Sequence, residues 1–185
     1  MLNTLPNLLT LARIVAIPAV VALLAVDWQV ARWIAFALFG AAAFTDWLDG
    51  KLARARGEVS PLGRFLDPIA DKLLVAAVVV MLVASGDVAG WAVGAAIVIL
   101  CREILVSGLR EYLAELSVPM PVSKLAKWKT AAQLAALSLL ILGPVLTMEL
   151  QLLAQALLWL AAGLTLITGW DYLSRGLAHM RTGSG

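Results

Sequence analysis

The residues that decide the fold are FTDWLDGKLARARGEVSPLGRFLDPIADKLL, from Phe44 to Leu74. This stretch holds four carboxylates in two pairs, Asp46 with Asp49 and Asp67 with Asp71. Residues three or four positions apart lie on one face of a helix, so each pair shares a face if its segment is helical. Apolar runs begin directly outside both pairs. Because charge is costly at the end of a membrane span, the four acids predict a positively charged ligand.

The chemistry of the four carboxylates favours a hard divalent cation as that ligand. Oxygen-only ligand sets suit Mg²⁺ or Mn²⁺ rather than zinc. The two helices that carry the pairs are sequential and antiparallel, so the pairs can face each other across a helix interface. Four carboxylates in that arrangement can hold two divalent cations about 4 Å apart, the usual geometry for displacement at phosphorus. We therefore predict a site for two Mg²⁺ or Mn²⁺ ions.

Composition places the chain in the membrane class. Of its 185 residues, 62% are hydrophobic and only 14% are charged, which is more apolar surface than a soluble domain of this size can hide. The length suggests one domain over residues 1–185. A formal net charge of +2 gives no argument for nucleic acid, so no nucleic-acid partner is expected. With one cysteine and one histidine, the chain offers no disulfide, no zinc cluster and no plausible Ser/His/Asp triad.

The predicted fold class is all-α, a polytopic integral membrane protein with six transmembrane helices. A short N-terminal interfacial helix is expected before them, over residues 3–12. Pro68 predicts local irregularity in the third span, and the first and fifth spans are the shortest. The six spans are expected at about residues 13–26, 30–55, 61–84, 88–113, 125–142 and 148–173, followed by a short polar tail.

The first 26 residues could be mistaken for a signal peptide, because Arg13 is followed by an apolar run. Residues 1–12 contain no lysine or arginine, however, so this segment is expected to stay in the mature protein.

The distribution of basic residues predicts the orientation. Six spans put both termini on one side, and every lysine and arginine except Arg32 falls on that side. By the positive-inside rule this side is cytoplasmic, so we expect a multi-pass protein of the bacterial inner membrane with its acid pairs and both termini in the cytoplasm. Five tryptophans near span ends are expected to anchor the helices at the two interfaces: Trp28, Trp33, Trp91, Trp128 and Trp170.

The small residues between the acid pairs have two interpretations. Gly50, Ala53 and Gly63 leave room for a base or ribose to approach, and Arg54 can pair with phosphate. Equally, small residues favour close helix packing in membranes. Spacing alone leaves both interpretations open.

A second group of charges lies at the inner ends of the fourth and fifth spans. Arg102 and Arg110 end the fourth span, and Lys124, Lys127 and Lys129 open the fifth. Such cations beside an acidic metal site suit an anionic headgroup such as a phosphate monoester. The alternative is ordinary contact with anionic lipid, which weighs most for Lys124. For the two arginines, near the end of a largely apolar span, we favour phosphate binding.

The central stretch resembles the signature of the CDP-alcohol phosphotransferase family, integral-membrane enzymes that make phospholipids. All eight specified residues are present, in the spacing Asp46-x2-Asp49-Gly50-x2-Ala53-Arg54-x8-Gly63-x3-Asp67-x3-Asp71.

The resemblance implies roles for these residues. Three acids would be the principal metal ligands, and Asp71 would be the general base that takes the proton from the acceptor hydroxyl, while also lying near the second metal. The implied metal ligands are Asp46, Asp49, Asp67 and Asp71. The implied site for the cytidine nucleotide of the donor is lined by Asp49, Gly50, Ala53, Arg54 and Gly63.

Four further segments resemble the bacterial branch of the family that makes phosphatidylglycerophosphate. They are PNLLTLARI (6–14), CREILVSGLREYL (101–113), PVSKLAKWKT (121–130) and LTLITGWDYL (164–173). The branch implies CDP-diacylglycerol as donor, sn-glycerol 3-phosphate as acceptor, surrounding membrane lipids and a homodimer. It implies acceptor phosphate binding by Arg102, Arg110, Lys127 and Lys129.

Two details of that resemblance remain open. Asn7 and Thr10 are implied as donor-side contacts, although helix capping and surface solvation explain them as well. Ala126 departs from the branch, which commonly has glycine there, and its methyl group is expected to crowd a loop without removing a charged ligand.

Three alternatives compete with this prediction. The same fold and chemistry can serve another acceptor: inositol phosphate, serine or phosphatidylglycerol. A divalent-cation transporter also carries acids on its spans, but these acids cluster at one membrane face rather than at the midplane, where transporters usually bind. A structural membrane subunit leaves the acid spacing unexplained. We therefore predict a CDP-diacylglycerol-dependent phosphatidyltransferase.

Overall fold

The computed structural model describes residues 5–56, 61–116, 118 and 123–182. Side chains are described over the same ranges except at residues 5–7, 46–56, 61, 62, 64 and 179–182. Over these ranges the secondary structure is helical and contains no β-strand, which confirms the all-α prediction.

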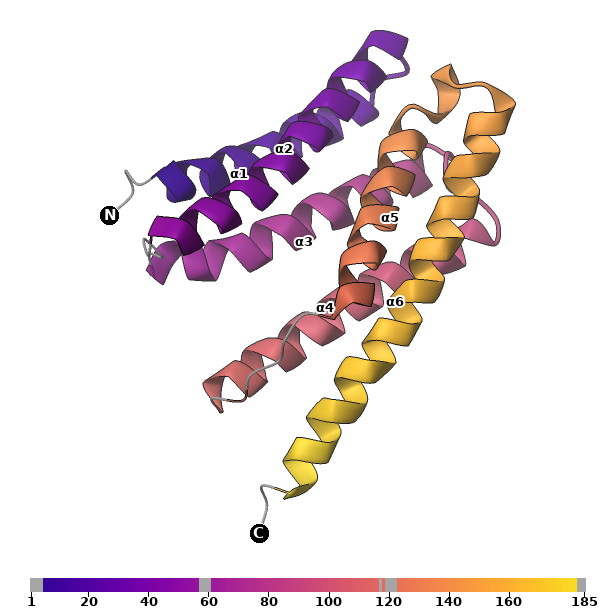
Figure 1. Ribbon diagram of the computed structural model, residues 1–185. Coiled ribbons are helices and arrows are strands. Elements are labelled where there is room, and N and C mark those ends of the chain that lie inside the picture. The colour runs from indigo at the N-terminus through magenta and orange to yellow at the C-terminus, as the bar shows by residue number, and fades with distance from the viewer. Residues whose placement is uncertain (1–4, 57–60, 117, 119–122, 183–185) are drawn as a thin grey trace. The chain divides into compact units, whose positions relative to one another are not determined.

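Six α-helices and one short 3₁₀ turn make up the fold (Figure 1). They are α1 (Leu5–Leu24), α2 (Gln29–Arg56), α3 (Pro61–Ala84), α4 (Ala92–Glu115), α5 (Lys124–Ile141), the 3₁₀ turn η1 (Gly143–Val145) and α6 (Met148–Thr182). The start of α3 at Pro61 and the break at Gly143 agree with the sequence signals, because both are local effects of proline and glycine.

The two ends of the chain differ from expectation. Instead of an interfacial helix followed by a separate span, Leu5–Leu24 forms one continuous helix. Pro6 lies in its first turn, where a missing N–H costs nothing, so nothing breaks the helix between the two predicted pieces. At the other end, α6 continues to Thr182 through the predicted polar tail. Arg175 supports this extension by pairing with Asp171, one turn earlier, at 3.1 Å.

Two predicted boundaries in the middle also change. α3 passes through Pro68 as a continuous helix, so the expected irregularity does not interrupt it. α4 begins only at Ala92, later than the expected residue 88. The delay has a backbone cause: Gly86 and Gly90 adopt φ values of +82° and +56°, a left-handed conformation that a helix cannot contain.

Contacts divide the chain into two compact units, which are described separately. Unit 1 is Met1–Val88 with Leu137–Gln151, and unit 2 is Ala89–Ala136 with Leu152–Gly185. The prediction of a single domain over residues 1–185 stays a prediction.

In unit 1, α1 packs along both α2 and α3, and over the described residues these contacts are more extensive than those between α2 and α3 (Figure 1). The core here is apolar, with Val20, Phe39 and Leu82 fully buried. Whether the two acid pairs face each other across a helix interface stays a prediction, because the side chains of Asp46 and Asp49 are not described; α1 packs along both acid-bearing helices. Residues of α1 are therefore placed to contact the acid-bearing end of α3.

A buried ion pair joins three segments of unit 1. Arg32, at the beginning of α2, lies 2.5 Å from the Asp87 carboxylate in the turn after α3. The Ser85 hydroxyl donates to the same carboxylate at 2.5 Å, and Arg32 also donates to the Ile141 carbonyl at 3.4 Å, at the end of α5. Arg32, the one basic residue predicted outside the cytoplasmic face, is thus neutralised within the fold.

In unit 2, α4 and α6 run parallel and approach closely at two glycines. A Cβ atom at Gly169 would lie 2.9 Å from Arg102 Cγ, and one at Gly176 would lie 2.9 Å from a Leu109 methyl carbon. The two contacts are seven residues apart on α4 and also on α6. A repeat of seven residues keeps the same faces of two packed helices in contact. The absence of side chains at the two glycines lets α4 pack directly on α6.

Two helices are long and apolar enough to cross a membrane, Ala92–Glu115 and Met148–Ala178. Leu8–Leu24 and Gln29–Thr45 are shorter apolar helices within the described residues. Only 22% and 28% of the most apolar windows of α4 and α6 are buried, as expected of helices that face lipid. The five tryptophans predicted to anchor the interfaces are also exposed. These features support a membrane protein.

Candidate active site

The acid pairs lie on helices, as the spacing predicted. Asp46 and Asp49 are in the last part of α2, and Asp67 and Asp71 are in the first part of α3. At three and four residues apart, each pair shares one helix face. Several predicted site residues lie outside the described side chains: Asn7, Asp46, Asp49, Gly50, Ala53 and Arg54.

α1 brings a hydroxyl group to one of the predicted metal ligands. Thr10 is almost completely buried, and its hydroxyl donates a hydrogen bond to Asp67 Oδ1. Arg13, one turn further along α1 and equally buried, puts a positive charge on the same helix face. Thr10 was predicted as a contact of the donor substrate, whereas here it orients a carboxylate. Such second-layer hydrogen bonds commonly fix the direction of metal ligands.

The described residues at the start of α3 fit a hard divalent cation by their donor chemistry. Asp67 and Asp71 are half-buried and one turn apart, so two carboxylates point from one face. Gly63, buried one turn earlier, adds no bulk. Among the described residues no cluster of three possible ligands is complete, since the side chains of Asp46 and Asp49 are not among them. An all-oxygen set suits Mg²⁺ or Mn²⁺.

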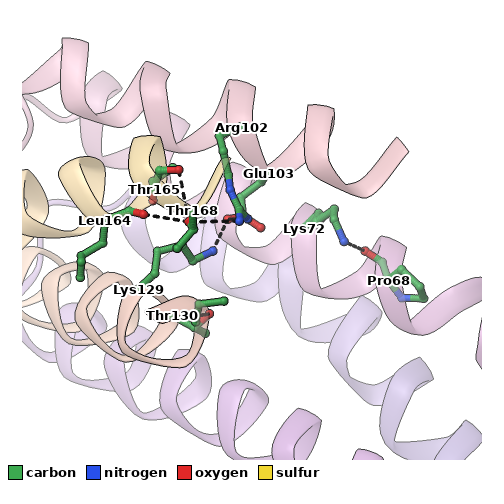
Figure 2. A network of polar contacts seen from close by, with 10 residues as sticks. Pro68, Lys72, Arg102, Glu103, Lys129, Thr130, Leu164, Thr165 and Thr168 are labelled. Carbon is green, nitrogen blue, oxygen red and sulfur yellow. Dashed lines mark hydrogen bonds and ion pairs between the residues drawn. The ribbon is translucent and has the colours of Figure 1, made fainter. Parts of the chain in front are cut away.

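The basic residues of unit 2 form a network across three helices (Figure 2). In α4, Arg102 Nη1 lies 3.3 Å from Glu103 Oε1. The Lys129 ammonium of α5 contacts the same carboxylate oxygen. From α6, the Thr168 hydroxyl oxygen accepts a hydrogen bond from Arg102 Nη2 at 3.2 Å. The Arg102 guanidinium also stacks over the Tyr172 ring, 5.6 Å from its centroid.

These charges are largely shielded from solvent. The side chains of Arg102, Glu103 and Lys129 are 11%, 15% and 5% exposed. Interactions between charges strengthen as water is excluded, so this network is much stronger than a surface pair. Two buried cations thus meet at one carboxylate oxygen.

Three buried polar atoms beside this network have no hydrogen-bond partner in the described part of the chain. They are Arg102 Nε, Gln133 Oε1 and Thr165 Oγ1. Gln133 lies one turn from Lys129 on α5, and Thr165 lies about one turn from Thr168 on α6. Both residues are therefore next to the basic network. Buried polar atoms normally have partners, so these three are suited to a bound ligand or ordered water.

The four residues predicted to bind the acceptor phosphate divide into two pairs. Arg102 and Lys129 come together in the buried network, whereas Arg110 and Lys127 are exposed. Lys124 is also exposed, in agreement with its alternative role as a lipid contact. Phosphate binding by all four residues stays a prediction.

Ala126 is a buried residue of α5. It lies in the first turn of α5, where its N–H donates to the Ser123 hydroxyl at 3.1 Å. Ser123 therefore caps the helix, and alanine in that turn favours the helix more than glycine does. The effect of its methyl group on the preceding loop stays a prediction, because residues 119–122 lie outside the described ones.

Several residues of the network were missed from the sequence. The sequence patterns assign no role to Glu103, Thr168, Gly169 or Tyr172. Their common signal is the presence of polar or small residues in an otherwise apolar span, which is itself an indication of function. Their partners lie on other helices, so the sequence could not assign the contacts.

The helical membrane fold and its acidic signature define a class of lipid-synthesising transferase. The chain belongs to the CDP-alcohol phosphatidyltransferase family, whose sequence profile matches residues 3–167. This confirms the family resemblance.

Individual relatives match along nearly their whole length. One is the CDP-diacylglycerol–glycerol-3-phosphate 3-phosphatidyltransferase of Rickettsia bellii, 47% identical over 172 residues, with 92% of this chain and 93% of the relative covered. Proteins of the same name from Pseudomonas fluorescens and Bacillus subtilis are 42% and 40% identical. They cover 96% of this chain each, and 92% and 97% of their own length.

Proposed function

We propose that this protein transfers the phosphatidyl group of CDP-diacylglycerol to sn-glycerol 3-phosphate, giving phosphatidylglycerophosphate and CMP. The observation that carries the proposal is the near-full-length similarity to enzymes named for this reaction, up to 47% identity over 92% of the chain. The complete eight-residue signature supports the same chemistry.

In this proposal the two acid pairs, Asp46 with Asp49 and Asp67 with Asp71, hold two Mg²⁺ or Mn²⁺ ions. When bound, such ions neutralise charge on the phosphate oxygens of the donor. Asp67 is held in place by the Thr10 hydroxyl, so its carboxylate is oriented before any ligand arrives.

Asp71 acts as the general base. It takes the proton from the 1-hydroxyl of the acceptor, whose oxygen attacks the phosphatidyl phosphorus, while the bond from phosphorus to CMP breaks. Asp49, Gly50, Ala53, Arg54 and Gly63 line the nucleotide site, with Asn7 on the donor side. Thr10 contributes there through Asp67.

The basic network binds the acceptor phosphate. Arg102 and Lys129 provide buried positive charge, and the unpartnered Arg102 Nε is a donor suited to a phosphate oxygen. Gln133 Oε1 is suited to accept a hydrogen bond from an acceptor hydroxyl. Arg110 and Lys127, which are exposed, attract the anion from solution.

The proposed setting is the bacterial inner membrane, crossed six times by one domain with the active site and both termini in the cytoplasm. Helix lengths support this topology, because α1, at 20 residues and about 1.5 Å per residue, is long enough for a hydrocarbon core of about 30 Å. The parallel packing of α4 on α6 is also what two even-numbered spans require. The homodimer is proposed from the family resemblance.

The test is release of CMP by purified protein in detergent with CDP-diacylglycerol and Mg²⁺. Glycerol 3-phosphate is compared with inositol phosphate, serine and phosphatidylglycerol, and a reaction without acceptor is the control. We expect release with glycerol 3-phosphate alone. Release with another acceptor instead would overturn the acceptor assignment, and no release with any acceptor, even with Mn²⁺, would overturn the reaction.

A further inference from the structure

The carboxylate of Glu103 is the point where two buried cations meet. Its Oε1 atom accepts from Arg102 Nη1 at 3.3 Å and from the Lys129 ammonium (Figure 2). Arg102 precedes Glu103 on α4, whereas Lys129 comes from α5, so this one oxygen connects the two helices.

Electrostatics explains why a carboxylate is needed between them. With side chains 11% and 5% exposed, Arg102 and Lys129 have little water to screen their mutual repulsion. A buried charge that loses a partner is strongly unfavourable, so removal of the Glu103 carboxylate would weaken the contact between α4 and α5 and let the two cations move apart. Glu103 therefore stabilises both positive charges in neighbouring positions.

Three residues of α6 contact the Arg102 side chain: Thr168, Gly169 and Tyr172. Thr168 donates its own hydroxyl hydrogen to the Leu164 carbonyl at 2.8 Å, which leaves its oxygen facing Arg102 as an acceptor. Gly169 lies against Arg102 Cγ, and the Tyr172 ring lies under the guanidinium. Glu103 and Thr168 together hold Nη1 and Nη2, so the guanidinium plane is fixed at both ends.

We propose that Glu103 is a positioning residue of the acceptor-phosphate site, which holds Arg102 and Lys129 together so that one phosphate can engage both. This inference rests on the proposed function. Glu103 acts through the two cations and does not touch the substrate. Arg102 has a donor left for a phosphate oxygen, because its buried Nε has no hydrogen-bond partner among the described residues.

The test removes the Glu103 charge and keeps its shape. Glu103→Gln is compared with Glu111→Gln, which changes an exposed carboxylate on the same helix whose described partner is Ser107. CMP release by the full-length protein in detergent is measured while glycerol 3-phosphate and CDP-diacylglycerol are varied in turn. Inorganic phosphate is added as a competing probe of the anion site.

We expect Glu103→Gln to raise KM for glycerol 3-phosphate and the inhibition constant of inorganic phosphate together, by about tenfold, as for loss of a hydrogen bond between charged groups. KM for CDP-diacylglycerol and kcat stay near wild type, and Glu103→Asp recovers part of the loss. An unchanged KM with a lower melting temperature would make the role merely structural. A lowered KM would show that the carboxylate competes with phosphate, and either result overturns the inference.

A second variant approaches Arg102 from the opposite helix, in case Glu103→Gln does not fold. Gly169→Ala places a Cβ atom 2.9 Å from Arg102 Cγ and displaces that side chain. Gly163→Ala, on the same helix but with nothing within 4 Å, is the control. We expect a higher KM for glycerol 3-phosphate from the first substitution only, and equal values for the two would overturn the inference.

Failure of the proposed function gives a different result. If wild-type protein releases no CMP with glycerol 3-phosphate, the function fails, and phosphate binding is then followed by the protection that inorganic phosphate gives against thermal unfolding. Protection of wild type and Glu111→Gln but not of Glu103→Gln would uphold the positioning role. Equal protection of all three proteins, or protection of none, would overturn it.

Discussion

The acidic region of unit 1 and the basic network of unit 2 manage buried charge in opposite ways. At the start of α3, Asp67 receives a hydrogen bond from an uncharged hydroxyl, that of Thr10. In the basic network a charged partner takes this place, because the Glu103 carboxylate contacts both Arg102 and Lys129. In the proposed function the acidic site binds cations from solution, whereas the basic network binds the phosphate of the acceptor.

Removal of divalent cations should have the largest effect on activity, and it should act on the acidic site only. Chelation with EDTA should abolish CMP release, and Mg²⁺ or Mn²⁺ should restore it, because the carboxylates then regain their counter-charge. The melting temperature of wild type should also fall on chelation, while that of Asp67→Asn changes less. Full activity after exhaustive chelation would contradict the metal site.

Replacement of the proposed base should have the next largest effect. Asp71→Asn should lower kcat by about 10³-fold, since general-base catalysis contributes about 10²–10⁴. The protein should still elute as a folded species in detergent. Asp27→Asn, which changes an exposed acid in the turn before α2, is the matched control and should retain activity. Near-normal turnover of Asp71→Asn would end the general-base assignment.

Removal of the hydrogen bond from α1 tests how the Asp67 carboxylate is held in place. Thr10→Val keeps the side-chain shape and removes the donor to Asp67. We expect the Mg²⁺ concentration for half-maximal activity to rise about tenfold, which is the lower end of the effect of removing a group that hydrogen-bonds to a metal ligand. KM for glycerol 3-phosphate should not change, because the acceptor phosphate binds elsewhere in the proposal. A change in that KM with an unaltered Mg²⁺ requirement would speak against the positioning of Asp67.

The exposed cations should have the smallest effect. Arg110→Ala should raise KM for glycerol 3-phosphate about threefold at low salt and less at high salt, because screening weakens interactions of exposed charges. Arg175→Ala, another exposed arginine, serves as the control. A loss that does not depend on salt would indicate that Arg110 contacts the phosphate directly.

The sequence could predict features that depend on residues close together in the chain. The family signature lies within the 26 residues from Asp46 to Asp71, so its spacing identified the acids without any knowledge of the fold. Proline and glycine marked the start of α3 and the break before α6 for the same reason. Two predicted helix boundaries were wrong. The interfacial segment and the first span form one helix, and α6 continues beyond Leu173, because the polar residues at these points do not end a helix.

Only the tertiary structure decided which side chains meet across helices. Thr10 contacts Asp67, Lys129 contacts Glu103, and Gly169 admits Arg102, in each case from a distant part of the chain. The physical reason is that helical spacing fixes which residues share a face, but not which helix that face packs against. The sequence by itself therefore determined the chemistry available to this protein, and packing decided how its buried charges are paired and held.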